Sequence, residues 1–184
     1  QVKGLDEYPE ITPVIKEKEH KINFGGLWHS DTAYEQTPPL GTMLYARQLP
    51  PYGGDTEFSN MYLAYETLSN GMRALLENLI AVNISGKGRV QDTRAPMRGK
   101  AATSAREDSF IAEHPVVRTH PETGRKSLYV NLAHTSHFKG MTVEESAPIL
   151  DYLFEHQVKP EFTCRVKWEV GTLTFWDNRC TQHN

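Results

Sequence analysis

The sequence has little cysteine, no long apolar run and no excess of one charge. Its 184 residues include two cysteines, Cys164 and Cys180, which form no CxxC pair and are too few for a disulfide framework. We therefore expect reduced thiols in a cytoplasmic protein. No apolar stretch approaches the about 20 residues of a transmembrane helix, and the first residues do not resemble a signal peptide. These absences argue against a membrane partner.

The charges are nearly balanced. Lys and Arg number 20 against 23 Asp and Glu, so the net charge is −3, which gives no reason to expect nucleic acid as a partner. Hydrophobic residues make up 38% and charged residues 23%, which is typical of a globular protein, and the length suits one domain with its own core.

Several short segments favour β-strands. Residues 40–49 and 172–176 are strand-like, and residues 162–168 alternate apolar and polar side chains as a half-buried strand does. Residues 116–119 and 127–131 flank the turn at 121–124, which indicates a hairpin. Together with two inserted helices, these strands predict a mainly β fold, and periodicity leaves open whether it is a sandwich or a barrel.

Two segments predict helices. Met72, Leu75, Leu76 and Leu79 form one apolar stripe, with Ser69 or Asn70 as the N-cap. Residues 142–145 fit a capping box at the start of a second helix. Because Pro148 lacks a backbone N–H, we expect the regular part of this helix to begin near Ser146.

Residues 84–112 differ from the rest of the chain. Apolar side chains are sparse there, glycine is frequent and basic residues outnumber acidic ones. A stretch this long without a core pattern is typical of a lid over a site or of a mobile insertion.

The segments that carry chemistry lie far apart. His29 and Asp31 form a His-x-Asp pair, and on a strand such residues point to the same face. A second imidazole, from His183, would complete two histidines and one carboxylate, the set used by non-haem Fe(II) oxygenases. The same three donors can also hold catalytic zinc, but the sequence has no HExxH-type segment to supply a general base. Taken alone, His29 could be a hydrogen-bonded structural histidine and Asp31 a cap or turn residue.

Five segments together resemble the taurine dioxygenase family, which includes phenoxyacetate-herbicide and alkyl-sulfate dioxygenases. They occur in family order and are WHSDTAY, TPPLGTMLYARQLPPYGGDTEF, HPVVRTHPETGRKSLYVN, EESAPILDYLFEHQVKPEFTCRVKW and TLTFWDNRCTQH. The resemblance implies a double-stranded β-helix (jelly roll) as a single domain over residues 1–184. It also implies Fe(II) held by His29, Asp31 and His183, with 2-oxoglutarate as co-substrate.

Further roles follow from the same resemblance. Thr56 matches the hydroxyl that holds the distal carboxylate of 2-oxoglutarate, and Trp176 matches an aromatic residue beside that co-substrate. Tyr34 and His134 match substrate-facing positions. Gly25 stands where the taurine enzyme has an asparagine that binds the sulfonate, which argues against taurine as the substrate.

We expect both ends of this chain to be incomplete. It has no initiator methionine and stops at Asn184, before the family's two downstream arginines. The function implied is hydroxylation of a small anionic molecule (a sulfonate, alkyl sulfate or aryloxy acid) by O2, giving succinate and CO2. The alternative is a non-catalytic jelly roll that binds metal and 2-oxoglutarate. A homo-oligomer would be common among such enzymes.

Overall fold

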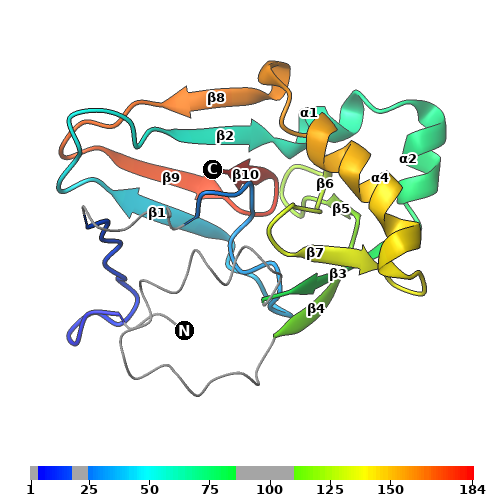
Figure 1. Cartoon of the computed structure of the whole chain (residues 1–184), viewed down its shortest axis with the longest axis horizontal. Helices are drawn as coiled ribbons and strands as arrows, with labels where there is room; N and C mark the ends of the chain where they lie inside the picture. Colours follow the sequence, from blue (N-terminus) through cyan, green and yellow to red (C-terminus); the bar gives the residue numbers. More distant parts are fainter. Residues whose placement is uncertain (1–3, 18–24, 86–109) are drawn as a thin grey trace.

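The structure, a computed structural model, describes residues 4–17, 25–85 and 110–184. In these residues strands outnumber helices, which confirms the predicted mainly β fold with inserted helices (Figure 1). The strands are β1 (Gly41–Tyr45), β2 (Thr56–Asn60), β3 (Ile80–Ile84), β4 (Ile111–Pro115), β5 (Val117–Thr119), β6 (Lys126–Leu128), β7 (Thr135–Phe138), β8 (Thr163–Val166), β9 (Leu173–Asp177) and β10 (Thr181–His183). The helices are α1 (Met61–Glu66), α2 (Asn70–Leu76), α4 (Val143–His156) and the short 3-10 helix η2 (Pro160–Phe162).

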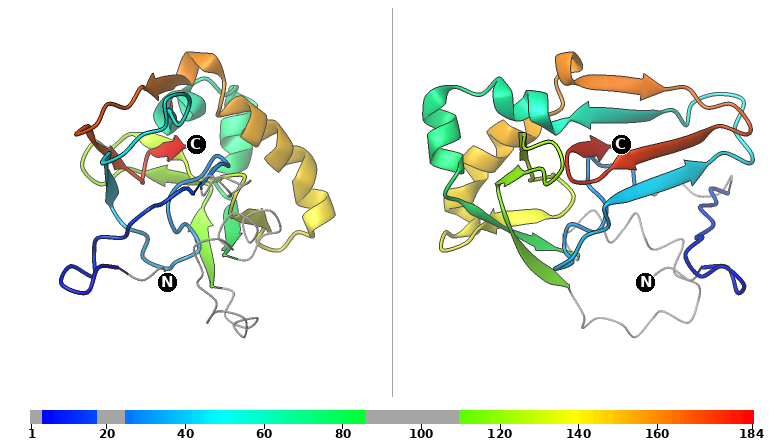
Figure 2. Two further views of the ribbon diagram at one scale, coloured as in Figure 1. Left: turned by 60° about the vertical axis from the view of Figure 1, so that its left-hand side comes forward. Right: turned by 180° about the vertical axis from the view of Figure 1, so that it is seen from behind.

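The strands pair in small antiparallel sheets. Within the described ranges, the orders are β10-β2-β8 and β4-β3-β7 in two three-stranded sheets, and β1-β9 and β5-β6 in two-stranded ones. Figures 1 and 2 show strands β1, β2, β8 and β9 at one end of the molecule and the helices at the other.

Strand register brings distant residues together. In the β1–β9 pair Thr42 lies opposite Trp176, and in the β10–β2 pair His183 lies opposite Phe58. An isolated antiparallel bridge joins His29 to His183. These pairings align segments from opposite ends of the sequence.

The main core lies where helices cover strands. Helix α1 contacts β6, and α4 contacts β7. The apolar side chains between them are almost fully excluded from water, and this burial is the main stabilising term. They include Met61, Leu76, Leu128, Phe138 and Leu153.

Helix α4 begins earlier than the sequence predicted. The expected capping box is present, with Thr142 and Glu145 bonding to each other's backbone N–H groups. The helix starts at Val143 and contains Pro148, so the predicted start near Ser146 was wrong. The reason is that the Ser146 N–H and hydroxyl both donate to the carbonyl of Thr142, which fixes the first turn ahead of the proline.

Other predictions had mixed outcomes. Helix α2 with Ser69 as N-cap and the hairpin of β5 and β6 were confirmed. The sequence reading missed helix α1 and strands β2, β3, β4, β7 and β10. The lid or mobile insertion at 84–112 stays a prediction: Ile84 ends β3 and Ile111 begins β4, and residues 86–109 between them lie outside the described residues. Among those described, no helix has the length and apolar character to cross a bilayer.

Candidate metal centre

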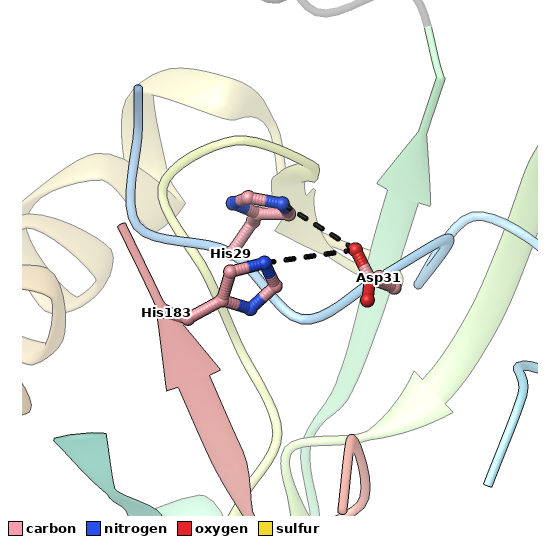
Figure 3. Close-up of side chains that lie close together, drawn as sticks. All are labelled: His29, Asp31 and His183. Atoms are coloured by element: carbon pink, nitrogen blue, oxygen red, sulfur yellow. Dashed lines mark ion pairs between the residues drawn. The ribbon is translucent and has the colours of Figure 1, made fainter. Parts of the chain in front are cut away.

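His29, Asp31 and His183 meet at one point (Figure 3). The Nε2 atoms of His29 and His183 lie 3.5 Å and 3.8 Å from the same oxygen, Oδ1 of Asp31. The three ligand atoms are all within 4.8 Å of one another. A single cation placed between them would contact two imidazoles and one carboxylate.

The backbone fixes the two histidines against each other. The N–H of His29 donates to the carbonyl of His183 at 3.1 Å, and the N–H of His183 donates back to His29 at 2.9 Å. The prediction that a strand carries both His29 and Asp31 was wrong: beyond the bridge at His29 the chain turns, and Thr32 has a φ of 45°. The turn therefore aims Asp31 at the imidazoles.

Gly25 lies directly beside His29. Its φ is +73°, in the region that favours glycine, and a Cβ there would lie 3.3 Å from Cε1 of the His29 ring. Gly25 thus leaves room for the imidazole, a role that the sequence did not predict.

Hydrogen bonds orient the donor atoms. Nδ1 of His29 donates to the carbonyl of Leu27 at 2.6 Å, so the proton is held there and the lone pair of Nε2 faces Asp31. Oδ2 of Asp31 accepts from the Thr42 hydroxyl at 2.6 Å, which leaves Oδ1 for the imidazoles. His29 and Asp31 are thereby turned toward the common point.

A second layer supports the Thr42 hydroxyl. Its oxygen accepts from the Asn178 side-chain amide at 2.9 Å, and the oxygen of that amide accepts from the Trp176 indole at 3.0 Å. Asn178 is 1% exposed. The sequence reading missed Thr42 and Asn178, although Asn178 lies inside the Trp-Asp-Asn segment and could have been suspected from that position.

The protonation states suit a cation. Burial alone would raise the pKa of Asp31, but when the imidazoles are protonated, a hydrogen bond from His29 and the charges of His183 and His29 outweigh burial and hold this pKa well below its usual range. Burial, together with the charge of His29, lowers the pKa of His183 to about 4 against the opposing effect of Asp31. Near neutral pH, Asp31 is therefore anionic and His183 neutral, as metal ligands must be.

Aromatic rings shield one side of the centre. The Trp176 ring lies 4.7 Å from that of His183, and Phe58 stacks on His183 at 6.0 Å. Trp176 is 8% exposed. The structure thus brings the predicted Trp176 to the candidate ligand His183, together with Phe58, which the sequence did not single out.

Tyr34 and His134 lie on another side of His29. Their rings meet edge to face at 4.9 Å, and His134 contacts the His29 ring in the same manner at 6.2 Å. The predicted substrate-facing pair is therefore adjacent to a proposed metal ligand. Thr56 is on β2, two residues before Phe58.

A second group of donors comprises His120, Asp177 and Cys180. Nε2 of His120 lies 3.0 Å from Asp177, and its Nδ1 accepts the backbone N–H groups of residues 122–123. Arg179 also bonds both carboxylate oxygens of Asp177. Because both ring nitrogens are engaged and a guanidinium already pairs with the carboxylate, this group is structural.

Comparison with known proteins identifies the relatives of this arrangement. A family model described as "Taurine catabolism dioxygenase TauD, TfdA family" matches residues 4–184. The chain belongs to the TauD/TfdA family. The family recognised from the sequence is therefore confirmed.

Individual members of the TauD/TfdA family agree in sequence and shape. An alpha-ketoglutarate-dependent 2,4-dichlorophenoxyacetate dioxygenase from Burkholderia sp. (strain RASC) is 39% identical over 159 residues, covering 85% of this chain and 51% of that protein. The crystal structure of a taurine dioxygenase from Burkholderia xenovorans superposes with a TM-score of 0.77 at 34% identity, covering 100% of this chain and 57% of that one. A crystal structure of AAD-2 in complex with Mn(II) and N-oxalylglycine has a TM-score of 0.73 at 34% identity, covering 86% and 61%. The chain thus spans about half the length of the curated relatives it matches.

Proposed function

We propose that this chain carries the metal-binding part of an Fe(II)- and 2-oxoglutarate-dependent dioxygenase that hydroxylates a small organic anion. The observation that carries the proposal is the convergence of His29, Asp31 and His183, whose ligand atoms lie within 4.8 Å of one another. Two histidines and one carboxylate leave coordination positions open, as a non-haem Fe(II) oxygenase requires.

The residues present fit such an ion. The hydrogen bonds from His29 to Leu27 and from Thr42 to Asp31 leave Nε2 of His29 and Oδ1 of Asp31 facing the common point, where Nε2 of His183 also lies. AAD-2, a structure of similar shape, binds Mn(II) and N-oxalylglycine, a structural analogue of 2-oxoglutarate. That complex supports assigning both groups to this site.

The chain's own residues would orient the reactants and exclude water. When bound, iron and 2-oxoglutarate supply the activation of O2 and the hydroxylation of a C–H bond, with succinate and CO2 as products. Trp176 and Phe58 cover the His183 side of the site, and the Thr56 hydroxyl would hold the distal carboxylate of 2-oxoglutarate. Excluding water in this way limits side reactions.

We further propose that the substrate binds beside Tyr34 and His134. The His134 ring lies next to that of His29 and the Tyr34 ring lies next to that of His134; His134 is 1% exposed, so a group there would be shielded from solvent. Relatives of this chain include dioxygenases named for a phenoxyacetate, for taurine and for sulfate esters. Their shared chemistry supports a small organic anion, and a screen of such anions for substrate-dependent succinate release would identify it.

The jelly-roll topology, the single domain over residues 1–184, a cytoplasmic location and a homo-oligomeric state are part of the same proposal. Similarity to the taurine dioxygenase structure at a TM-score of 0.77 supports the topology. The other three are expectations from the sequence.

The test is metal binding followed by turnover. Anaerobic calorimetry with Mn(II) should detect one site, and Asp31→Ala should weaken its affinity by at least about 100-fold because a charged ligand is lost. Asp151→Ala, which removes an exposed carboxylate of α4, serves as the matched control. With Fe(II), 2-oxoglutarate and O2, the unaltered protein should form succinate, and His29→Ala should not. Full Mn(II) affinity in folded Asp31→Ala would refute the assignment.

A further inference from the structure

Trp168 makes a partly buried contact with Thr56. The indole N–H of Trp168 donates to the Thr56 hydroxyl oxygen at 3.0 Å. Trp168 follows β8 by two residues, and the β2–β8 register places Thr56 opposite Val166, the last residue of β8. Trp168 is 9% exposed, so water competes little for this hydrogen bond.

Thr56 faces the same side of its sheet as the metal ligands. Thr56 and Phe58 are two apart on β2, so both side chains point to one face, about 7 Å apart along the strand. Phe58 on that face stacks against His183 and also meets the Trp176 ring at 5.3 Å. The Thr56 hydroxyl therefore lies on the same face of the sheet as the candidate metal ligands, next to Phe58 along the strand.

The Trp168 contact constrains where the hydroxyl hydrogen can point. A threonine hydroxyl has one hydrogen to donate and two lone pairs to accept with. The indole has no acceptor, so it uses one lone pair of Thr56 and leaves the hydrogen for another partner. In the described part of the chain, the Thr56 hydroxyl donates to no protein oxygen. It is thus a donor held ready for an acceptor that comes from outside the protein.

We propose that Trp168 is a positioning residue for the co-substrate carboxylate, acting through Thr56. By occupying the acceptor side of the hydroxyl, its indole N–H turns the Thr56 hydrogen toward the carboxylate oxygen and excludes the opposite orientation. The hydrogen bond from Trp168 also polarises the Thr56 hydroxyl, which strengthens the hydrogen bond from Thr56 to the carboxylate. The inference rests on the proposed function, since it assigns Trp168 a part in binding the same 2-oxoglutarate.

A double-mutant cycle tests the link between the two side chains. Trp168→Phe keeps an aromatic ring and removes the N–H, while Thr56→Val keeps the shape and removes the hydroxyl. With Mn(II)-loaded protein and no O2, Trp168→Phe should weaken 2-oxoglutarate binding by roughly threefold to tenfold, the effect of one hydrogen bond. In the Thr56→Val background the same change should have no further effect.

The controls separate positioning from packing. Mn(II) affinity should be unchanged in Trp168→Phe, because Trp168 bonds Thr56 and not a metal ligand. Thr56→Ser, which restores a hydroxyl, should recover most of the affinity lost in Thr56→Val. An equal loss from Trp168→Phe in both backgrounds would show that the ring acts by packing and would overturn the inference.

A second measurement uses the unaltered protein and so does not depend on the variant folding. The chain has three tryptophans, Trp28, Trp168 and Trp176. In Zn(II)-loaded, 15N-labelled protein, the Trp168 indole N–H resonance should shift when 2-oxoglutarate binds, and this shift should disappear in Thr56→Val. An unshifted Trp168 resonance at saturating 2-oxoglutarate overturns the inference alone, whereas absence of any 2-oxoglutarate binding overturns the proposed function with it.

Discussion

At the scale of single residues, the candidate centre depends on side chains that never touch the ion. Thr42 occupies Oδ2 of Asp31 and is itself held by Asn178, so the carboxylate presents one oxygen to the imidazoles. Such supporting bonds typically change metal affinity by about 10–100-fold when they are removed.

We therefore expect Thr42→Val to weaken Mn(II) binding by about tenfold, because Oδ2 loses its donor and Asp31 becomes free to rotate. Calorimetry at pH 7.5 would measure the change. Thr119→Val, the same substitution at an exposed position of strand β5, is the control and should bind Mn(II) as the unaltered protein does. An unchanged affinity in Thr42→Val would mean that the Asp31 rotamer is fixed by other contacts.

The sequence pointed to the three candidate ligands but not to the residues that support them, for a physical reason. His29, Asp31 and His183 belong to residue types and segments that carry metal chemistry, so they can be recognised locally. Thr42 has no such signal, because its role arises only when β1 pairs with β9 and sets it opposite Trp176. Hydrogen bonds between distant segments follow from register, which the local pattern does not encode.

At the scale of elements, helix α4 shows how a cap can offset a proline. Its N-terminus has reciprocal bonds between Thr142 and Glu145, and Leu150 and Leu153 bury its apolar side. The sequence predicted the cap but gave Pro148 too much weight. Strand β2 and helix α1 were missed because each is short, and an abrupt change from strand to helix at Met61 leaves neither enough residues to show a period.

Thr142→Ala should lower the free energy of unfolding by about 1 kcal/mol, since the N–H of Glu145 loses its acceptor. Urea denaturation followed by circular dichroism would measure this. Thr142→Ser keeps the hydroxyl and should retain most of the stability. If alanine and serine gave the same stability, the cap would contribute nothing to the folded protein.

At the scale of the whole molecule, an ionic cluster ties the turn after β9 to the β5–β6 hairpin. Asp177 pairs with Arg179 and His120, and Arg179 also bonds Glu122. Burial alone would raise the pKa of Asp177, but hydrogen bonds from Arg179 and His120 outweigh it and lower this pKa to about 2. The carboxylate is thus stabilised in its charged form by the fold.

This lowered pKa predicts how stability depends on acid. The folded-state pKa lies below the ordinary value of 3.8, so the contribution of Asp177 is fully present above about pH 4 and is lost as the pH falls toward 2. Asp177→Asn should therefore be less stable by about 1–2 kcal/mol above pH 4, allowing for solvent screening, with the difference vanishing near pH 2. Urea unfolding at several pH values would test this, with Asp151→Asn as the control. A deficit that stayed constant down to pH 2 would contradict the ionic explanation.

The backbone bridge between His29 and His183 has a thermodynamic consequence for the ion. In an unfolded chain, bringing together two ligands separated by roughly 150 residues would have a loop-closure cost of roughly 4 kcal/mol. Here the reciprocal amide–carbonyl contacts have already closed that loop when the polypeptide folds. A cation that binds here would therefore not have to close that loop, because the backbone that carries the two imidazoles is already in place.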